Sequence, residues 1–208
     1  GVCEHVMFAL RAHMGEEALA EQSSWAIRNL AATPENKLKL SEAGACDTMA
    51  GLLRSHKKVP SVIEAVLGAM TNLAIDEGCR GKICRAGGIE ALVSAVRQNI
   101  SHAPVFQQGA AAIINIAFNI SNSEALGDSG ACNLLMTGIT THRSNASVVE
   151  ASCAAINKLA KCEENKERLV DAKIEKLLDS IMDNEAMSDQ GRSLANKAMK
   201  NFVAKNTA

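Results

Sequence analysis

The 208 residues carry 22 basic and 23 acidic side chains, so the chain lacks the positive charge that broad nucleic-acid binding requires. Hydrophobic residues make up 47% of the chain but aromatic residues only 2%, so alanine and leucine supply most of the apolar surface, which favours closely packed helices over a β-sheet. The sequence contains no run of about 18 apolar residues, which a transmembrane helix would need, and no signal peptide is visible.

One pattern recurs along the chain at a step of 43 residues. It is first seen as Trp25-Ala26-Ile27-Arg28-Asn29-Leu30-Ala31. The corresponding segments are residues 25–31, 68–74, 111–117, 154–160 and 197–203. Because the register does not slip, the sequence predicts an array of repeated units, each of which buries its apolar face against its neighbours.

Each complete unit is predicted to contain three helices. In the unit that starts near Thr33, a short helix over 35–42 begins after a cap and a first-turn proline, and a turn at Gly44 leads into a second helix over 45–55. A long third helix is predicted over 61–75. The later helices are predicted over 77–85, 89–98, 105–119, 123–128, 131–141, 146–161, 163–172, 174–183 and 188–204.

The units are expected to form a single array over residues 1–208. We predict a partial unit over 1–32, full units over 33–76, 77–119 and 120–162, and a terminal capping unit over 163–208. The first helix has an apolar stripe with Val2, Val6 and Leu10 that requires a further partner. The last helix is polar, with Lys197, Lys200 and Asn206 near its end, as expected of a unit that faces water.

The three-helix unit, its period, the glycine between the first two helices and the Trp-Ala-apolar-x-Asn-apolar-Ala third helix resemble armadillo repeats of the importin-α and β-catenin type, over essentially the whole chain. The resemblance implies an all-α fold, a right-handed α-solenoid whose third helices line a concave groove. It also implies that the groove holds an extended peptide, with each third-helix asparagine clamping the peptide backbone and the tryptophan packing its side chains.

Residues of this chain match that pattern unevenly. The asparagine position is filled by Asn29, Asn72, Asn115 and Asn201, whereas Lys158 replaces it in one unit and Asn157 precedes it. The tryptophan position is filled by tryptophan only at Trp25, so the sequence departs from an importin-like receptor, which has several tryptophan–asparagine pairs.

Helical spacing alone predicts the same outward stripe. Taking about 100° per residue, Asn72 lies with Glu64, Gly68, Thr71 and Ile75 opposite the buried face of its helix. The resulting candidate partner-binding residues are Glu21, Trp25, Arg28, Asn29, Glu64, Asn72, Gln107, Asn115, Phe118, Lys158 and Asn201.

Each of these candidates has a structural interpretation as well. An asparagine amide can hold a partner backbone, but it can equally bond to the neighbouring helix. Trp25 is either an exposed anchor or a residue packed on the next third helix. Glu21, Glu64 and Glu150 form an acidic row suited to basic ligand residues, or else a solvated face. Lys158 and Lys161 make the far end basic, so we expect a peptide of mixed charge.

The cysteines and histidines follow the repeat. Cys3, Cys46 and Cys132 share one position with Ile89, which predicts small buried apolar sites and a reducing compartment, the cytoplasm, with the nucleus as the alternative. The histidines that share a position, namely His13, His56 and His142, are predicted to cap second helices. We therefore expect no metal site and no cofactor.

The sequence thus predicts a protein-binding scaffold or adaptor that holds an extended segment of a partner protein in the groove. It contains no phosphate loop, HExxH or nucleophile elbow, so an enzyme is not expected. Binding of nucleic acid or insertion into a membrane is not expected either. The alternative is a structural segment of a larger solenoid protein that self-associates through its N-terminal face or convex side.

Overall fold

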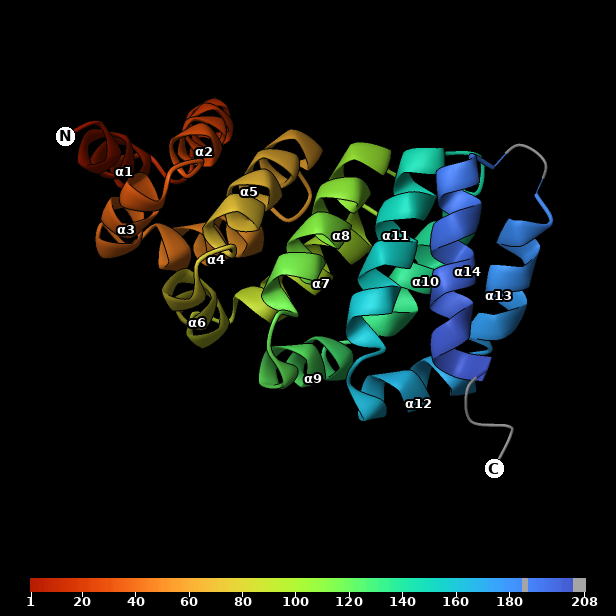
Figure 1. The fold of residues 1–208 in the computed structure, drawn as a ribbon. Helices are drawn as coiled ribbons and strands as arrows, with labels where there is room; N and C mark the ends of the chain where they lie inside the picture. The colour runs from red at the N-terminus through yellow and green to blue at the C-terminus, as the bar shows by residue number, and fades with distance from the viewer. Residues whose placement is uncertain (185–186, 204–208) are drawn as a thin grey trace. The chain divides into compact units, whose positions relative to one another are not determined.

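The computed structural model describes residues 1–184 and 187–203, and all regular structure within them is helical. The predicted all-α class is therefore confirmed. The chain forms two compact units, Gly1–Ile116 and Ala117–Ala208, and each is described by itself (Figure 1). Asn206 and the end of the predicted capping unit lie outside the described residues. Among the described residues, no helix has the length and apolar character needed to cross a bilayer.

Eight helices are described in the first unit. Their bounds are α1 Val2–Ala12, α2 Glu17–Leu30, α3 Pro34–Glu42, α4 Ala45–Ser55, α5 Pro60–Leu73, α6 Glu77–Arg85, α7 Gly88–Gln98 and α8 Ala103–Ile116. Lengths of 11, 14 and 9 residues follow one another from α1 to α3 and again from α4 to α6. The long helix α5 packs between α2 and α8, as Figure 1 shows.

The described part of the second unit contains six helices. Their bounds are α9 Ile120–Asp128, α10 Ala131–Thr141, α11 Ala146–Leu159, α12 Glu163–Asp171, α13 Ile174–Met182 and α14 Asp189–Val203. The long helices α11 and α14 pack together, and the short helices α9 and α12 pack together.

Each long helix buries one face in the core. Ile27, Met70 and Ile113 occupy the same repeat position and are at most 1% exposed. Ala69 and Ala112 precede them by one residue and are also fully buried. Small side chains at that position let α2, α5 and α8 pack closely against one another.

The long helices end two or three residues earlier than predicted. The sequence extended them to Ile75, Asn119 and Lys161, but they end at Leu73, Ile116 and Leu159. The cause is the start of the next short helix: the side chain of Asn119 accepts a hydrogen bond from the backbone N–H of Asn122 at 2.9 Å, and a capping residue cannot have helical geometry. Phe118 therefore lies in a loop and not on the outward stripe of α8.

A left-handed residue precedes each second helix. Gly44, Gly87 and Gly130 have φ of 81°, 67° and 87°, and Lys173 has φ of 64° at the same repeat position. We expect Lys173→Gly to raise the free energy of unfolding by about 0.5–1 kcal/mol, because a side chain disfavours this conformation. Chemical denaturation checks the value. Gly87→Ala is the reciprocal control and is expected to be destabilising; a loss of stability on Lys173→Gly would contradict the explanation.

The predicted burial of Cys3, Cys46 and Cys132 is confirmed. Within the described structure six of the seven cysteines are buried and Cys84 is half-buried, and none of them forms a disulfide. Burial, with a smaller contribution from the charge of Glu150, raises the pKa of Cys153 to about 12. This thiol therefore holds its proton in the folded chain at pH values where it loses it in the unfolded chain.

That difference predicts a loss of stability in alkali. The Cys153 contribution is complete below the unfolded thiol pKa of about 8.5, and about 2 kcal/mol of it is lost by pH 10. Between pH 7.5 and pH 10, we expect the free energy of unfolding to fall by about 2 kcal/mol less for Cys153→Ala than for the wild type. Urea unfolding at both pH values measures the two falls. Equal falls for the two proteins would refute the assignment.

Candidate partner-binding surface

The outward faces of α2, α5 and α8 are the candidate surface in the first unit. Asn72 and Asn115 hold equivalent places on α5 and α8 and are half-buried, whereas Asn29 on α2 is exposed. The three asparagines are thus found on three neighbouring helices, as the sequence predicted.

These asparagines do bond to the neighbouring helix. Nδ2 of Asn72 donates to the carbonyl oxygen of Arg28, and Nδ2 of Asn115 donates to that of Thr71, each at 2.8 Å. Both acceptors lie in the last turn of a helix, where carbonyl groups have no intrahelical partner. One amide N–H of each asparagine therefore caps the preceding long helix. For this N–H group, the prediction that the asparagines bond to the neighbouring helix is confirmed.

The remaining half of each amide is left available. The Oδ1 atoms of Asn72 and Asn115 accept no hydrogen bond from the described residues. Neither atom is buried, so both reach solvent. The Asn29 side chain makes no hydrogen bond within the described structure. Each amide can thus still offer a donor and an acceptor to a ligand.

Trp25 and Arg28 form a stacked pair over α5. The Arg28 guanidinium carbon lies 5.0 Å from the centre of the Trp25 ring. A Cβ atom built on Gly68 would lie 3.0 Å from Cδ of Arg28 and 3.4 Å from Cζ3 of Trp25, so the glycine provides the room for the pair. Gly68 was predicted on the outward stripe; that was wrong, because the pair from α2 covers it. Trp25 itself is half-buried, packed on the next long helix with part of its ring still accessible.

The predicted polar row is only partly available. Glu21 and Glu64 are half-buried and Gln107 is exposed, on α2, α5 and α8 respectively. In the second unit Glu150 accepts a hydrogen bond from Oγ of Ser188 at 2.5 Å, and Ser188 in turn accepts one from the N–H of Gly191 at the start of α14. Glu150 therefore holds a helix start in place.

The asparagine pattern changes in the second unit. Asn201 donates to Oδ1 of Asn157 at 2.9 Å, and Asn157 donates to the carbonyl oxygen of Leu194 at 3.4 Å. Asn157 thus joins the two long helices, and Lys158, at the usual asparagine position, is released from that role. Its ammonium lies 4.5 Å from the centre of the Phe118 ring.

Sequence reasoning missed a second set of contacts between successive repeats. The predicted positions of His13, His56 and His142 at the ends of second helices are confirmed. Beyond capping, Nε2 of His56 lies 2.7 Å from the carbonyl oxygen of Met14. At the same repeat position, Nδ2 of Asn99 donates to the carbonyl oxygen of Lys57 at 2.7 Å. The recurrence of these polar residues was the available signal, but the acceptors lie 42 residues away.

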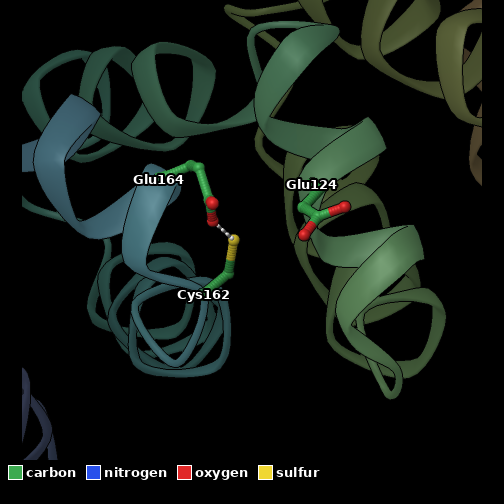
Figure 2. Close-up of side chains that lie close together, drawn as sticks. All are labelled: Glu124, Cys162 and Glu164. Atoms are coloured by element: carbon green, nitrogen blue, oxygen red, sulfur yellow. Dashed lines mark hydrogen bonds between the residues drawn. The ribbon is translucent and has the colours of Figure 1, made fainter.

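A group of three potential metal ligands was also missed. Figure 2 shows Glu124 of α9 facing Cys162 and Glu164 at the start of α12, and their ligand atoms all lie within 4.8 Å of one another. Cys162 is 3% exposed, its Sγ lies 3.0 Å from a Glu164 oxygen, and burial together with that carboxylate raises the pKa of the thiol. The thiol donates a hydrogen bond to the Glu164 carboxylate. A search of the sequence for paired cysteines and histidines cannot find this group, because Glu124 is 38 residues from Cys162.

Comparisons with known proteins identify the family. Several crystal structures of engineered proteins share the fold: one has a TM-score of 0.85 at 20% identity over 98% of this chain and 82% of its own, and a second has 0.84 at 22% over 97% and 48%. A third has 0.60 at 18% over 98% and 97%. No curated protein sequence matches significantly. The model of the GAC ARM domain, an armadillo-like repeat, matches residues 15–208, and the chain belongs to this family.

Proposed function

We propose that this chain is a protein-binding scaffold that holds an extended segment of a partner on the outward faces of α2, α5 and α8. Armadillo-like repeat domains typically bind proteins and are generally non-enzymatic. The observation that carries the proposal is the half-used asparagine amides: Asn72 and Asn115 keep a solvent-accessible Oδ1, and Asn29 is exposed and unbonded.

The spacing of the asparagines suits an extended backbone. Packed helices lie about 8–10 Å apart, and an extended chain advances about 3.3 Å per residue. One asparagine would therefore meet the ligand backbone about every three residues. We call Asn29, Asn72 and Asn115 the asparagine ladder. Because its amides would contact the backbone of the ligand and not the side chains, the ladder would hold segments of different sequence in one direction and register.

Selectivity would come from the groups beside the ladder. The accessible part of the Trp25 ring offers an apolar surface of the kind found at binding hot spots. Glu21 and Glu64, which lie on the neighbouring helices α2 and α5, would favour a basic residue in the ligand. Lys158 and Asn201 belong to the second unit, and we treat any contact that they make as a separate subsite.

A peptide-selection experiment tests the proposal. Random peptides are selected on the immobilised chain, and their affinities are measured for the wild type, for Trp25→Ala/Asn72→Ala and for the control Lys57→Ala, whose side chain lies in an exposed loop. We expect the double variant to bind at least about tenfold more weakly while remaining folded by circular dichroism, and the control to be unchanged. Equal binding by all three proteins would overturn the proposal.

A second candidate function rests on a different surface. On α1, Phe8 is 77% exposed and Val2 is 66% exposed, and Phe8 lines a hollow with Met7 and Arg11. Exposed apolar patches of this kind often mark interaction sites. The alternative is therefore a segment for assembly, with α1 of one copy packed on another. Sedimentation across a concentration series decides: association that Phe8→Glu abolishes supports it, and a monomer at all concentrations removes it.

A further inference from the structure

A small hollow in the second unit lies beside the loop that joins α8 to α9. It has a volume of about 250 Å³. We call it the Phe118 hollow. The residues that line it are Ala117, Phe118, Asn119, Ile120, Ser123, Lys158, Lys161 and Cys162. Compared with the several hundred cubic ångströms of a typical small-molecule site, this volume suits one side chain of a peptide and not a cofactor.

The apolar part of the hollow is exposed. Phe118 and Ile120 are each 67% exposed, although both are large hydrophobic residues. One repeat earlier, the same positions are occupied by Ile75 and Glu77, so the repeat does not require an aromatic ring followed by an aliphatic residue. The Asn119 cap between them fixes the loop, so the two side chains are presented in a defined place.

Two lysines supply the charged side chains in the lining of the hollow, and the carboxylate of Glu164 beside it accepts a hydrogen bond from the Cys162 thiol. Lys158 lies over the Phe118 ring at 4.5 Å, and Lys161 is exposed in the turn that follows α11. The lining includes two lysines and no aspartate or glutamate. A cation held against an aromatic face, next to a second cation, attracts a carboxylate and repels a basic ligand.

We propose that the Phe118 hollow binds a peptide segment in which an aspartate or glutamate neighbours an aliphatic or aromatic residue. The apolar side chain packs on Phe118 and Ile120, and the carboxylate contacts the ammonium groups of Lys158 and Lys161. This rests on the proposed function, since it assigns to the second unit the kind of partner segment that it recognises. The preference is opposite in sign to the one that Glu21 and Glu64 give the first unit.

Random-peptide selection on the whole chain supplies the probe for the test. The selected peptides are measured by fluorescence polarisation against the wild type, Lys161→Glu, Phe118→Ala and Trp25→Ala. Lys176→Glu is the matched control, because it reverses an exposed lysine on α13 of the same unit outside the hollow. All variants are checked for an unchanged thermal midpoint.

We expect a group of acidic-apolar peptides that bind the wild type, Trp25→Ala and Lys176→Glu alike and that bind Lys161→Glu and Phe118→Ala roughly five- to tenfold more weakly. The proposal is overturned if such peptides bind Lys161→Glu as tightly as they bind the wild type, or if the peptides that need Phe118 are basic. Peptides that depend on Trp25 alone would leave the groove proposal standing and remove this one, whereas no selected peptides at all would remove both.

Discussion

Met70→Ala is expected to lower the free energy of unfolding of the chain by about 2–5 kcal/mol. Met70 is fully buried on the inner face of α5, the helix that packs against both α2 and α8. Removing most of its side chain loses the transfer free energy and leaves a cavity in the core, which cannot collapse without moving the surrounding backbone. Guanidinium unfolding followed by circular dichroism measures the loss.

The control for Met70→Ala lies on the opposite face of an equivalent helix. Asn29 is exposed and its side chain makes no hydrogen bond within the described residues, so Asn29→Ala should change stability by no more than about 0.5 kcal/mol. The pair separates the inner face, which holds the fold, from the outer face, which we assign to binding. Similar losses for the two variants would show that this division is wrong.

Gly127→Ala is the second large effect, expected at about 2–4 kcal/mol of destabilisation. Gly127 lies on α9 under α12, and a Cβ atom there would overlap Oδ1 of Asn165 and Nη1 of Arg168. Asn165 is fully buried and donates to the carbonyl oxygen of Ser123 at 2.6 Å. Displacing it would break this bond between α9 and α12 and leave the buried Asn165 amide without its acceptor.

The same substitution in the first unit gives the comparison. Gly81 lies inside α6, and the nearest atom to an added Cβ is the guanidinium of Arg85, an exposed flexible side chain that can move. Alanine is a better helix former than glycine by about 1 kcal/mol, so Gly81→Ala should stabilise the chain. Thermal midpoints for both variants test the argument; a stabilising Gly127→Ala would refute the close packing of α9 and α12.

Helix order and the inner face of each helix could be predicted from the sequence because they depend on local signals. The left-handed glycines such as Gly44 and the apolar spacing of residues such as Met70 are short-range signals, and the 43-residue step shows that the same local signals recur in each unit. The ends of the long helices were predicted less well: apolar residues such as Ile75 and Phe118 continue the helical pattern, while the capping side chain of Asn119 ends it.

The candidate surface was predictable only in outline. The positions of Asn72 and Asn115 followed from their period, but their partners are unpaired carbonyl groups of another helix 44 residues earlier. Gly68 was misplaced because the pair that covers it comes from α2. Contacts between residues about 40 positions apart, such as Glu124 with Cys162, depend on how successive helices are aligned, which a helical angle within one segment does not contain.

The central claim is that the outward amides of α2, α5 and α8 bind a partner backbone. Side-chain amide resonances of the chain labelled with ¹⁵N-asparagine, recorded before and after addition of a selected peptide that needs Trp25, test it most directly. Shifts of Asn29, Asn72 and Asn115, with Asn99 and Asn165 unchanged in their interior hydrogen bonds, are the predicted result. Saturating peptide that leaves all three ladder resonances in place would contradict the account.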